Sequence, residues 1–163
     1  MIVNRDSQLW KYLPEELRGL ISDGESLIVE CQALSGKISD YSYLVFPFAK
    51  AYEGFLKNLF LDMGIIREED FYGDSIRIGR ILNPMFMEES ESVYAKLLTH
   101  SEHGRKAAER LWRSWKRGRN EVFHYFPHNF RRLSKETAVD IIEEMVGAMG
   151  QAIDILNSGK KNK

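Results

Sequence analysis

Three things are scarce in this sequence of 163 residues: cysteine, net charge and long apolar runs. The single cysteine, Cys31, excludes an internal disulfide and fits a reducing compartment, so we expect a cytoplasmic protein. A formal net charge of −1 provides no overall basic field, so a surface that binds nucleic acid would have to be local. No apolar run approaches the ~20 residues that span a bilayer. We expect neither a signal peptide nor a membrane anchor at the N-terminal segment, which carries charges at Arg5 and Asp6.

Helical periodicity, by contrast, extends over nearly the whole chain. Apolar residues make up 44% of the sequence and charged residues 29%, which is the balance of an ordinary globular protein. The length suits one domain with a substantial core. We find no internal repeat, no convincing pair of strands, and no low-complexity segment besides a short basic tail. The sequence therefore predicts an all-α bundle of about five or more helices in a single domain of residues 1–163, with its core at about 14–157 and the tail at 158–163.

Two helices are expected in the first part of the chain. One begins at Pro14, a residue suited to a first helical turn, and either runs on through Gly24 or restarts after it. The other has the strongest apolar pattern in the sequence and runs from Val45 to Met63, where Gly64 stops it. Pro47, near its start, predicts a first turn or a kink.

The second part of the chain is expected to end in two long helices. Short helical pieces around SIRIGRIL and SVYAKLL precede them within residues 65–104. A basic helix runs from about His103 to Phe126, and a final helix begins at Ser134, which is a good N-cap. The final helix carries apolar side chains on one face: Ala138, Ile141, Ile142, Met145, Met149 and Ile153.

One arginine of the basic helix lies where an apolar side chain would be expected. An advance of about 100° per residue gathers one apolar stripe, made of Ala108, Leu111, Trp112, Trp115, Val122 and Phe126. Arg119 falls within this stripe. The opposite face holds basic residues that solvent explains: Lys106, Arg110, Arg113 and Arg117. Because a guanidinium stays protonated, Arg119 needs a carboxylate, a cleft or a ligand anion, unless its stem lies on apolar surface while its head reaches water.

Two further features accompany Arg119. His124, five residues later, is a side chain that can move a proton near neutral pH, although an idle surface histidine is the alternative. On the helix that ends at Met63, Lys50, Glu53 and Lys57 share the polar face, where ordinary ion pairs are the alternative. Glu53 lies toward the edge of that face, where a neighbouring helix can bring Arg119 to it.

The segment RNEVFH, residues 119–124, followed by a loop and a final helix, resembles the HEPN superfamily. These are small α-helical proteins, many of them metal-independent ribonucleases of toxin–antitoxin, abortive-infection and CRISPR systems. The segment KAYEGFLK, residues 50–57, is similar to an earlier helix of the RNase LS-type toxin branch. The resemblance implies a HEPN-like bundle with four catalytic residues: Arg119, Asn120, His124 and Glu53. It also assigns the family's basic position to Lys50, whereas Phe126 stands where the RX4HXY toxins have a tyrosine.

The resemblance implies cleavage of single-stranded RNA by attack of the 2′-OH, with no metal and no cofactor. Such a reaction needs proton transfer, which His124 can perform, and positive charge at the phosphate, which Arg119 can supply. The residues expected to bind RNA are Lys50, Lys57, Arg113, Lys116 and Arg117. The expected partners are RNA, a second copy of the chain in a two-fold dimer, and an acidic antitoxin protein.

Helical geometry opposes this assignment. Five residues separate Arg119 and His124 by about 140° on an ideal helix. They converge only if the helix loosens between Gly118 and Pro127, if the arginine curls around, or if a dimer presents both in one cleft. One rival interpretation is a HEPN-like helical module that binds protein or RNA without catalysis. Another is a metal site built from the four histidines, which the single cysteine and the missing HExxH motif disfavour. Those histidines are His100, His103, His124 and His128.

Overall fold

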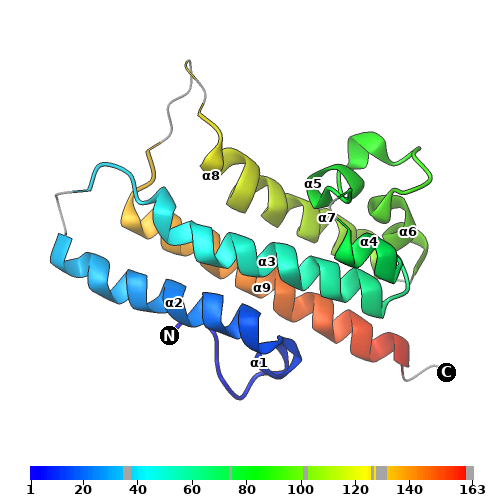
Figure 1. Cartoon of the computed structure of the whole chain (residues 1–163), viewed down its shortest axis with the longest axis horizontal. Coiled ribbons are helices and arrows are strands. Elements are labelled where there is room, and N and C mark those ends of the chain that lie inside the picture. Colours follow the sequence, from blue (N-terminus) through cyan, green and yellow to red (C-terminus); the bar gives the residue numbers. More distant parts are fainter. Residues whose placement is uncertain (35–37, 74, 101–102, 126, 128–131, 161–163) are drawn as a thin grey trace.

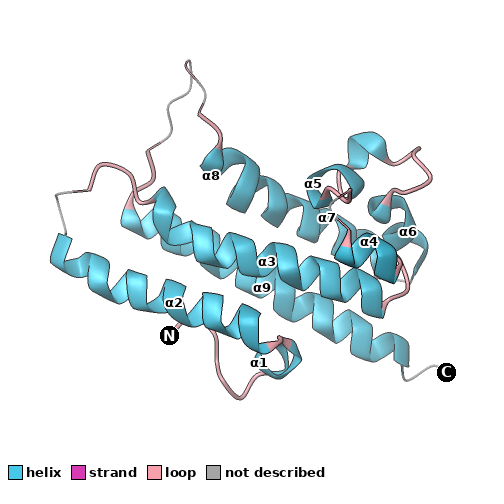
Figure 2. Ribbon diagram, in the orientation of Figure 1, coloured by secondary structure: helices cyan, strands magenta, loops and turns pink. Residues whose placement is uncertain are grey.

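The computed structural model describes the chain except residues 35–37, 74, 101–102, 126, 128–131 and 161–163. The side chains of residues 32, 34 and 155–160 are also outside the described part. All regular structure in the described residues is helical, as Figure 2 shows, so the predicted all-α class is confirmed.

The centre of the fold is α3 (Ser42–Asp62). It packs against α2 (Glu15–Glu30) and α9 (Lys135–Lys160), and α9 packs in turn against α7 (Gly104–Trp115) (Figure 1). The hydroxyl of Tyr52 in α3 donates to the Leu111 carbonyl of α7 over 3.0 Å, which ties these two helices together. Burial raises the pKa of Tyr52, so this donor stays protonated at ordinary pH.

The predicted apolar series of α3 forms the main core. Its members at Phe48, Tyr52, Phe55, Leu56 and Leu59 are at most 1% exposed. Their spacing of three and four residues places them on one face of the helix.

The start of α3 differs from the prediction, whereas its stop agrees with it. The helix begins at Ser42, three residues before the predicted start, where the Asp40 carboxylate accepts the Ser42 N–H over 3.0 Å. The same Asp40 oxygen accepts the Leu133 N–H over 3.1 Å and so joins the entries to α3 and α9. Pro47 lies inside the helix rather than in its first turn. Gly64 follows the helix with φ of 66°, a left-handed conformation that favours glycine, so the predicted stop is confirmed.

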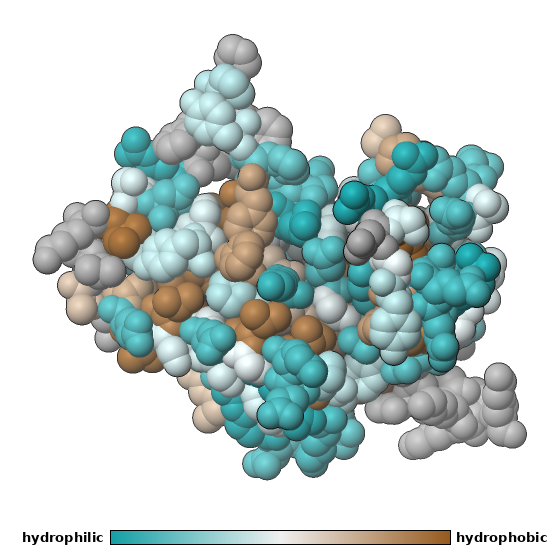
Figure 3. Space-filling view, in the orientation of Figure 1, coloured by the Kyte–Doolittle hydropathy of each residue, from teal (hydrophilic) through white to brown (hydrophobic). Residues whose placement is uncertain are grey.

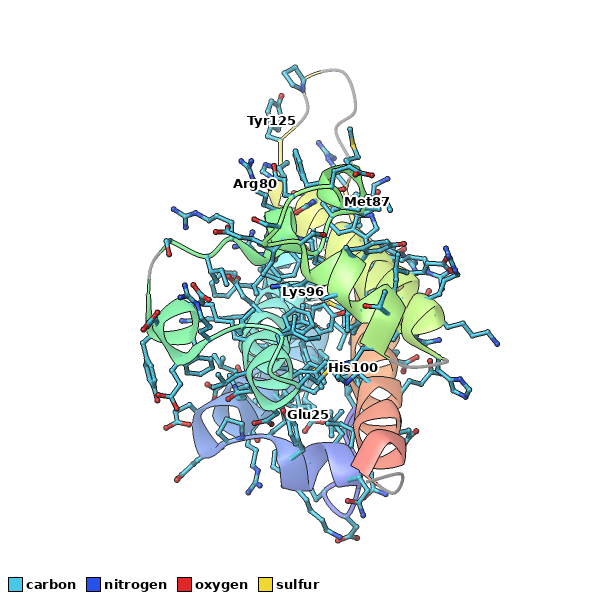
Figure 4. All side chains as sticks on the ribbon, turned by 90° about the vertical axis from the view of Figure 1, so that its right-hand side faces the viewer. Glu25, Arg80, Met87, Lys96, His100 and Tyr125 are labelled. Atoms are coloured by element: carbon cyan, nitrogen blue, oxygen red, sulfur yellow. The ribbon has the colours of Figure 1, made fainter. Side chains whose placement is uncertain are left out.

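The N-terminal part consists of α1 (Gln8–Tyr12), which the periodicity did not predict, and α2, which begins directly after Pro14. The helix α2 continues through Gly24 because that residue packs against Phe48, where a Cβ would lie 2.4 Å from the ring. A 3-10 turn, η1 (Cys31–Leu34), follows. Glu25 of α2, labelled in Figure 4, accepts the backbone N–H groups of the first residues and fastens the N-terminus to the bundle.

Four short elements join α3 to α7. They are α4 (Glu68–Tyr72), α5 (Ile78–Ile81), the 3-10 turn η2 (Pro84–Phe86) and α6 (Val93–His100). The predicted helical pieces around SIRIGRIL and SVYAKLL correspond to α5 and α6. Figure 1 shows these elements grouped at one end of the molecule.

The basic helix predicted for about 103–126 is not one regular helix. After α7 the chain makes a π-helical turn, η3 (Lys116–Asn120), and then a last turn of α-helix, α8 (Glu121–Phe123). Gly118 lies against α9 at this point, and a Cβ there would be 2.3 Å from the Met145 Sδ atom.

The final helix agrees with its prediction. Its N-cap is Ser134, whose hydroxyl oxygen accepts the Thr137 N–H over 3.1 Å. The predicted apolar face is at most 4% exposed and consists of Ala138, Ile141, Ile142, Met145, Met149 and Ile153. This face completes the core shared with α3 and α7.

Candidate functional site

Arg119 lies in the π-helical turn and extends toward α3. Its Nε atom is 3.3 Å from the Glu53 Oε2 atom, and its guanidinium lies 5.0 Å from the centroid of the Trp115 ring. Arg119 also lines a cleft, so two of the three surroundings predicted for it, a carboxylate and a cleft, are present. The side chain is 44% exposed, so the guanidinium is open to solvent as well as to its partners. The contact that the sequence predicted between Arg119 and Glu53 is confirmed.

The π-helical turn explains how Arg119 reaches this position. A π turn widens the helix by one residue and changes the direction of the side chains that follow it, and such turns occur frequently at functional sites. A loosened helix, one of the three conditions under which Arg119 and His124 could converge, is thus present, although it begins at Lys116 rather than at Gly118. Without a side chain on Gly118, the widened turn packs closely on Met145 of α9.

A cavity of ≈ 410 Å³ lies beside the Arg119–Glu53 pair, between α3 and the segment formed by η3 and α8. Its lining consists of Phe46, Ala49, Lys50, Glu53, Arg119 and Phe123. Lys50 is exposed and makes no ion pair within the described residues. Two cations and one carboxylate therefore border the cavity, which leaves a local excess of positive charge in a protein whose net charge is −1.

Two aromatic rings of this cavity were not predicted as site residues. Phe46 and Phe123 meet edge to face, with 5.9 Å between ring centroids and 85° between ring planes. They are 56% and 41% exposed, which is unusual for large apolar side chains in a protein with a well-filled core. The sequence did contain a signal for Phe46. It stands four residues before Lys50 and seven before Glu53, on the polar face of α3 and off the apolar series.

The hydropathy of this face of the molecule is mixed. Figure 3 shows hydrophobic side chains exposed over α3, with hydrophilic side chains beside them. This face therefore presents apolar and polar side chains next to each other.

The structure brings together three of the predicted site residues, Lys50, Glu53 and Arg119. Asn120 is the last residue of η3 and is half-buried next to Arg119. Lys57 lies one turn further along α3 and does not line the cavity.

The remaining basic residues predicted to bind RNA, Arg113, Lys116 and Arg117, do not line the cavity. Arg117 forms an ion pair with Glu144 of α9, and the Arg113 Nε atom is 4.0 Å from the same carboxylate. Glu144 therefore already provides a counter-charge for these two side chains. Lys116 is exposed and makes no ion pair within the described part of the chain.

One expectation for the opposite face of the basic helix is wrong. Arg110 is not simply solvated, because its Nε atom is buried and makes no hydrogen bond within the described residues. The small residue Gly147 lets its guanidinium lie against α9, where a Cβ would be 3.1 Å from an Arg110 Nη atom.

His124 follows α8 and is exposed, with an extended backbone conformation (φ −100°, ψ 129°). It is not among the residues that line the cavity, although its neighbour Phe123 is. Tyr125, the next residue, is 73% exposed and projects from the top of the molecule in Figure 4. Phe126, the position at which the RX4HXY toxins have tyrosine, is outside the described residues.

The described residues contain no group of three or more histidine, cysteine or acidic side chains placed to hold a metal ion. Figure 4 shows His100 well apart from Tyr125. His128 is outside the described residues. None of the described helices combines the length and the apolar character that crossing a bilayer requires.

Comparison of the chain with protein-family models, with curated proteins and with solved structures found no match. The resemblance of residues 50–57 and 119–124 to HEPN motifs therefore stays a prediction. What supports a function is the geometry of the cavity and the chemistry of its side chains.

Proposed function

We propose that this protein is a metal-independent endoribonuclease that cleaves single-stranded RNA by attack of a ribose 2′-OH on the adjacent phosphorus. The observation that carries the proposal is the position of Arg119. Arg119 lies in a π-helical turn, and its permanently charged side chain lines the cavity, where Lys50 provides a second cation. Two convergent cations provide positive charge and hydrogen-bond donors that can bind a phosphodiester.

Arg119 retains capacity to bind a phosphate despite its contact with Glu53. The ion pair uses the Nε edge of the guanidinium, which leaves the four Nη–H donors for other acceptors. Glu53 can therefore hold the planar group in one orientation while two Nη–H donors bind non-bridging phosphate oxygens. As the phosphorus becomes pentacoordinate, the charge on those oxygens increases, and a fixed guanidinium stabilises it.

The proton transfers are assigned to His124. Its neutral imidazole takes the proton of the 2′-OH as the 2′ oxygen bonds to phosphorus, and the bond to the 5′ oxygen breaks. The departing 5′ oxygen needs a proton, which an imidazolium donates. The products are a 2′,3′-cyclic phosphate and a 5′-OH, and Asn120 is placed to orient the arginine or the RNA. DNA lacks the nucleophile and would not react.

Because His124 does not line the cavity of its own chain, we propose that the active species is a two-fold dimer. In a dimer, His124 of one subunit approaches the cavity of the other. The variants Arg119→Ala and His124→Ala would then each be inactive alone. In an equal mixture of the two, about half of the dimers would be mixed, and each mixed dimer would have one intact site of two. The mixture would therefore have about a quarter of wild-type activity. A mixture as inactive as its components contradicts a shared site.

The basic residues near the cavity are also where an acidic antitoxin would bind. We therefore propose a role as a toxin of a toxin–antitoxin or phage-defence system, which follows from the HEPN resemblance. Its test is the neighbouring gene, where a small co-transcribed antitoxin is expected.

A second candidate function is a non-catalytic module that binds RNA or protein through the same cavity. Two observations favour it: Arg119 already has a counter-charge in Glu53, and His124 is outside the cavity. Binding without cleavage would then be the whole activity.

Cleavage of single-stranded RNA in EDTA separates the two functions. We expect the wild type to cleave, and both Arg119→Ala and His124→Ala to lose about 100-fold or more. Two matched controls, Arg67→Ala and His100→Ala, change an exposed ion-paired arginine and an exposed histidine that do not line this cavity, and should cleave like the wild type. A folded wild type as inactive as the variants, but still binding RNA, supports the module.

A further inference from the structure

We propose that Phe46 and Phe123 bind a nucleobase next to the phosphate that Arg119 and Lys50 hold. The inference deepens the proposed function and rests on it, because it identifies the class of ligand, a single-stranded RNA with an unpaired base at this position. It adds two residues that the catalytic motif does not contain.

The core gives no reason for either ring to be where it is. The apolar face of α3 is completely buried without Phe46, which lies on the opposite, polar face and is 56% exposed. Phe123 is 41% exposed at the end of α8. Exposed aromatic rings that meet at a cavity, rather than singly on the surface, mark a place where a ligand is bound.

The arrangement of the two rings leaves room for a third. In an edge-to-face pair, at least one ring has a face that its partner does not cover. A planar nucleobase can stack on that face, as unpaired bases stack on aromatic side chains in many RNA-binding proteins. The cavity volume of ≈ 410 Å³ is within the roughly 300–1,000 Å³ of ordinary small-ligand sites.

The spacing along α3 matches a nucleotide. Phe46 and Lys50 are four residues apart, so they lie on adjacent turns of one face, separated by about 6 Å along the helix axis. A base on Phe46 would thus have its phosphate near Lys50, and Arg119 would approach the same phosphate from η3. An apolar ligand without charge would leave both cations unused, and an anion without a ring would leave both phenylalanines exposed.

Binding of RNA with 2′-O-methyl riboses, which cannot be cleaved, tests the inference separately from catalysis. Fluorescence anisotropy would compare the wild type with Phe46→Ala, Phe46→Trp and the control Tyr72→Ala, an aromatic residue of α4 that is 80% exposed and does not line this cavity. We expect Phe46→Ala to weaken binding by about 5- to 150-fold, the range for one stacked base, and Phe46→Trp to restore it. Tyr72→Ala should bind like the wild type.

A second arm removes the base instead of the ring. Oligonucleotides with one abasic position, moved along the strand, should bind the wild type less well at one position, whereas Phe46→Ala should no longer distinguish that position. A free mononucleotide that competes at the concentration where RNA binds would identify the ligand as a small nucleotide and overturn the assignment to RNA.

The possible results separate this inference from the proposed function. If Phe46→Ala binds RNA as tightly as the wild type, the inference is wrong, while cleavage by the wild type still supports the nuclease. If Phe46→Ala weakens RNA binding but the wild type does not cleave RNA, the base site is supported and the proposed nuclease activity is wrong. If the wild type binds no RNA, both are wrong.

Discussion

Replacing Glu53 by glutamine should strengthen RNA binding and weaken RNA cleavage. The substitution keeps the size of the side chain but removes the negative charge that lies 3.3 Å from the Arg119 Nε atom. A phosphate then has no competitor for the guanidinium, so its affinity increases. The same change loosens the orientation of Arg119, so the bound RNA reacts more slowly.

The size of the first effect follows from the exposure of the pair. At 3.3 Å two unit charges interact with about 1.3 kcal/mol at the dielectric constant of water and about 5 kcal/mol at an effective value of 20. Because the side chains are 44% and 34% exposed, screening reduces this to about 1 kcal/mol or less. We therefore expect RNA affinity to rise by up to about fivefold, and the free energy of unfolding to fall by no more than about 1 kcal/mol.

The assay measures the dissociation constant and the single-turnover rate of Glu53→Gln on the same RNA, at low and high salt. The gain in affinity should shrink at high salt, and the rate at saturating protein should fall by about tenfold or more. Glu88→Gln, the same charge change at an exposed residue outside the cavity lining, is the control. Weaker binding by Glu53→Gln in a folded protein would refute the view that Glu53 competes with the phosphate.

Two further predictions concern the structure that supports the site. Gly118→Ala should lower the free energy of unfolding by about 1–3 kcal/mol in urea denaturation, because its Cβ would meet the buried Met145 side chain. The control Gly19→Ala, whose Cβ would have nothing within 4 Å, should raise the free energy of unfolding by about 0.5–1 kcal/mol. Equal effects of the two substitutions would contradict the tight packing of the π turn. Burial would raise the pKa of Asp40, but the hydrogen bonds that it accepts, including that from the Leu133 N–H, outweigh burial and hold the pKa below its ordinary value. The contribution of Asp40 to stability is therefore present above about pH 3.9 and is lost as the pH falls toward the lower pKa of Asp40 in the folded protein. If the wild type and Asp40→Asn showed the same pH dependence of unfolding in that range, this prediction would be wrong.

The parts of the fold that the sequence predicted well are those fixed by local pattern. The apolar series of α3 and α9 and the stop at Gly64 follow from helical spacing and from the conformational freedom of glycine. The contact of Arg119 with Glu53 was predictable for a different reason. A guanidinium on an apolar stripe needs a counter-charge, and few carboxylates stand on the edge of a polar face.

The parts that the sequence did not predict depend on tertiary contacts. The π turn depends on how closely Gly118 packs on Met145, which lies 27 positions further along the chain. No local pattern in residues 116–120 predicts this turn. The ion pairs of Arg113 and Arg117 with Glu144 likewise require the packing of α7 and η3 on α9.

The contact between Phe46 and Phe123, on which the proposed base site rests, was not predicted because only one of the two rings had a local signal. Phe46 lies outside the apolar series of α3, so a role other than core packing could have been predicted for it. Phe123 lies next to the predicted apolar stripe, and only the shift after the π turn brings it to Phe46.

The most direct test of the central claim, that Arg119 and His124 promote attack by a ribose hydroxyl, uses a DNA oligonucleotide that contains one ribonucleotide. In EDTA the wild type should cleave it only on the 3′ side of that ribonucleotide and leave a 2′,3′-cyclic phosphate, identified by mass spectrometry, and neither Arg119→Ala nor His124→Ala should do so. Cleavage at deoxyribonucleotides, or the same product from both variants, would contradict the claim.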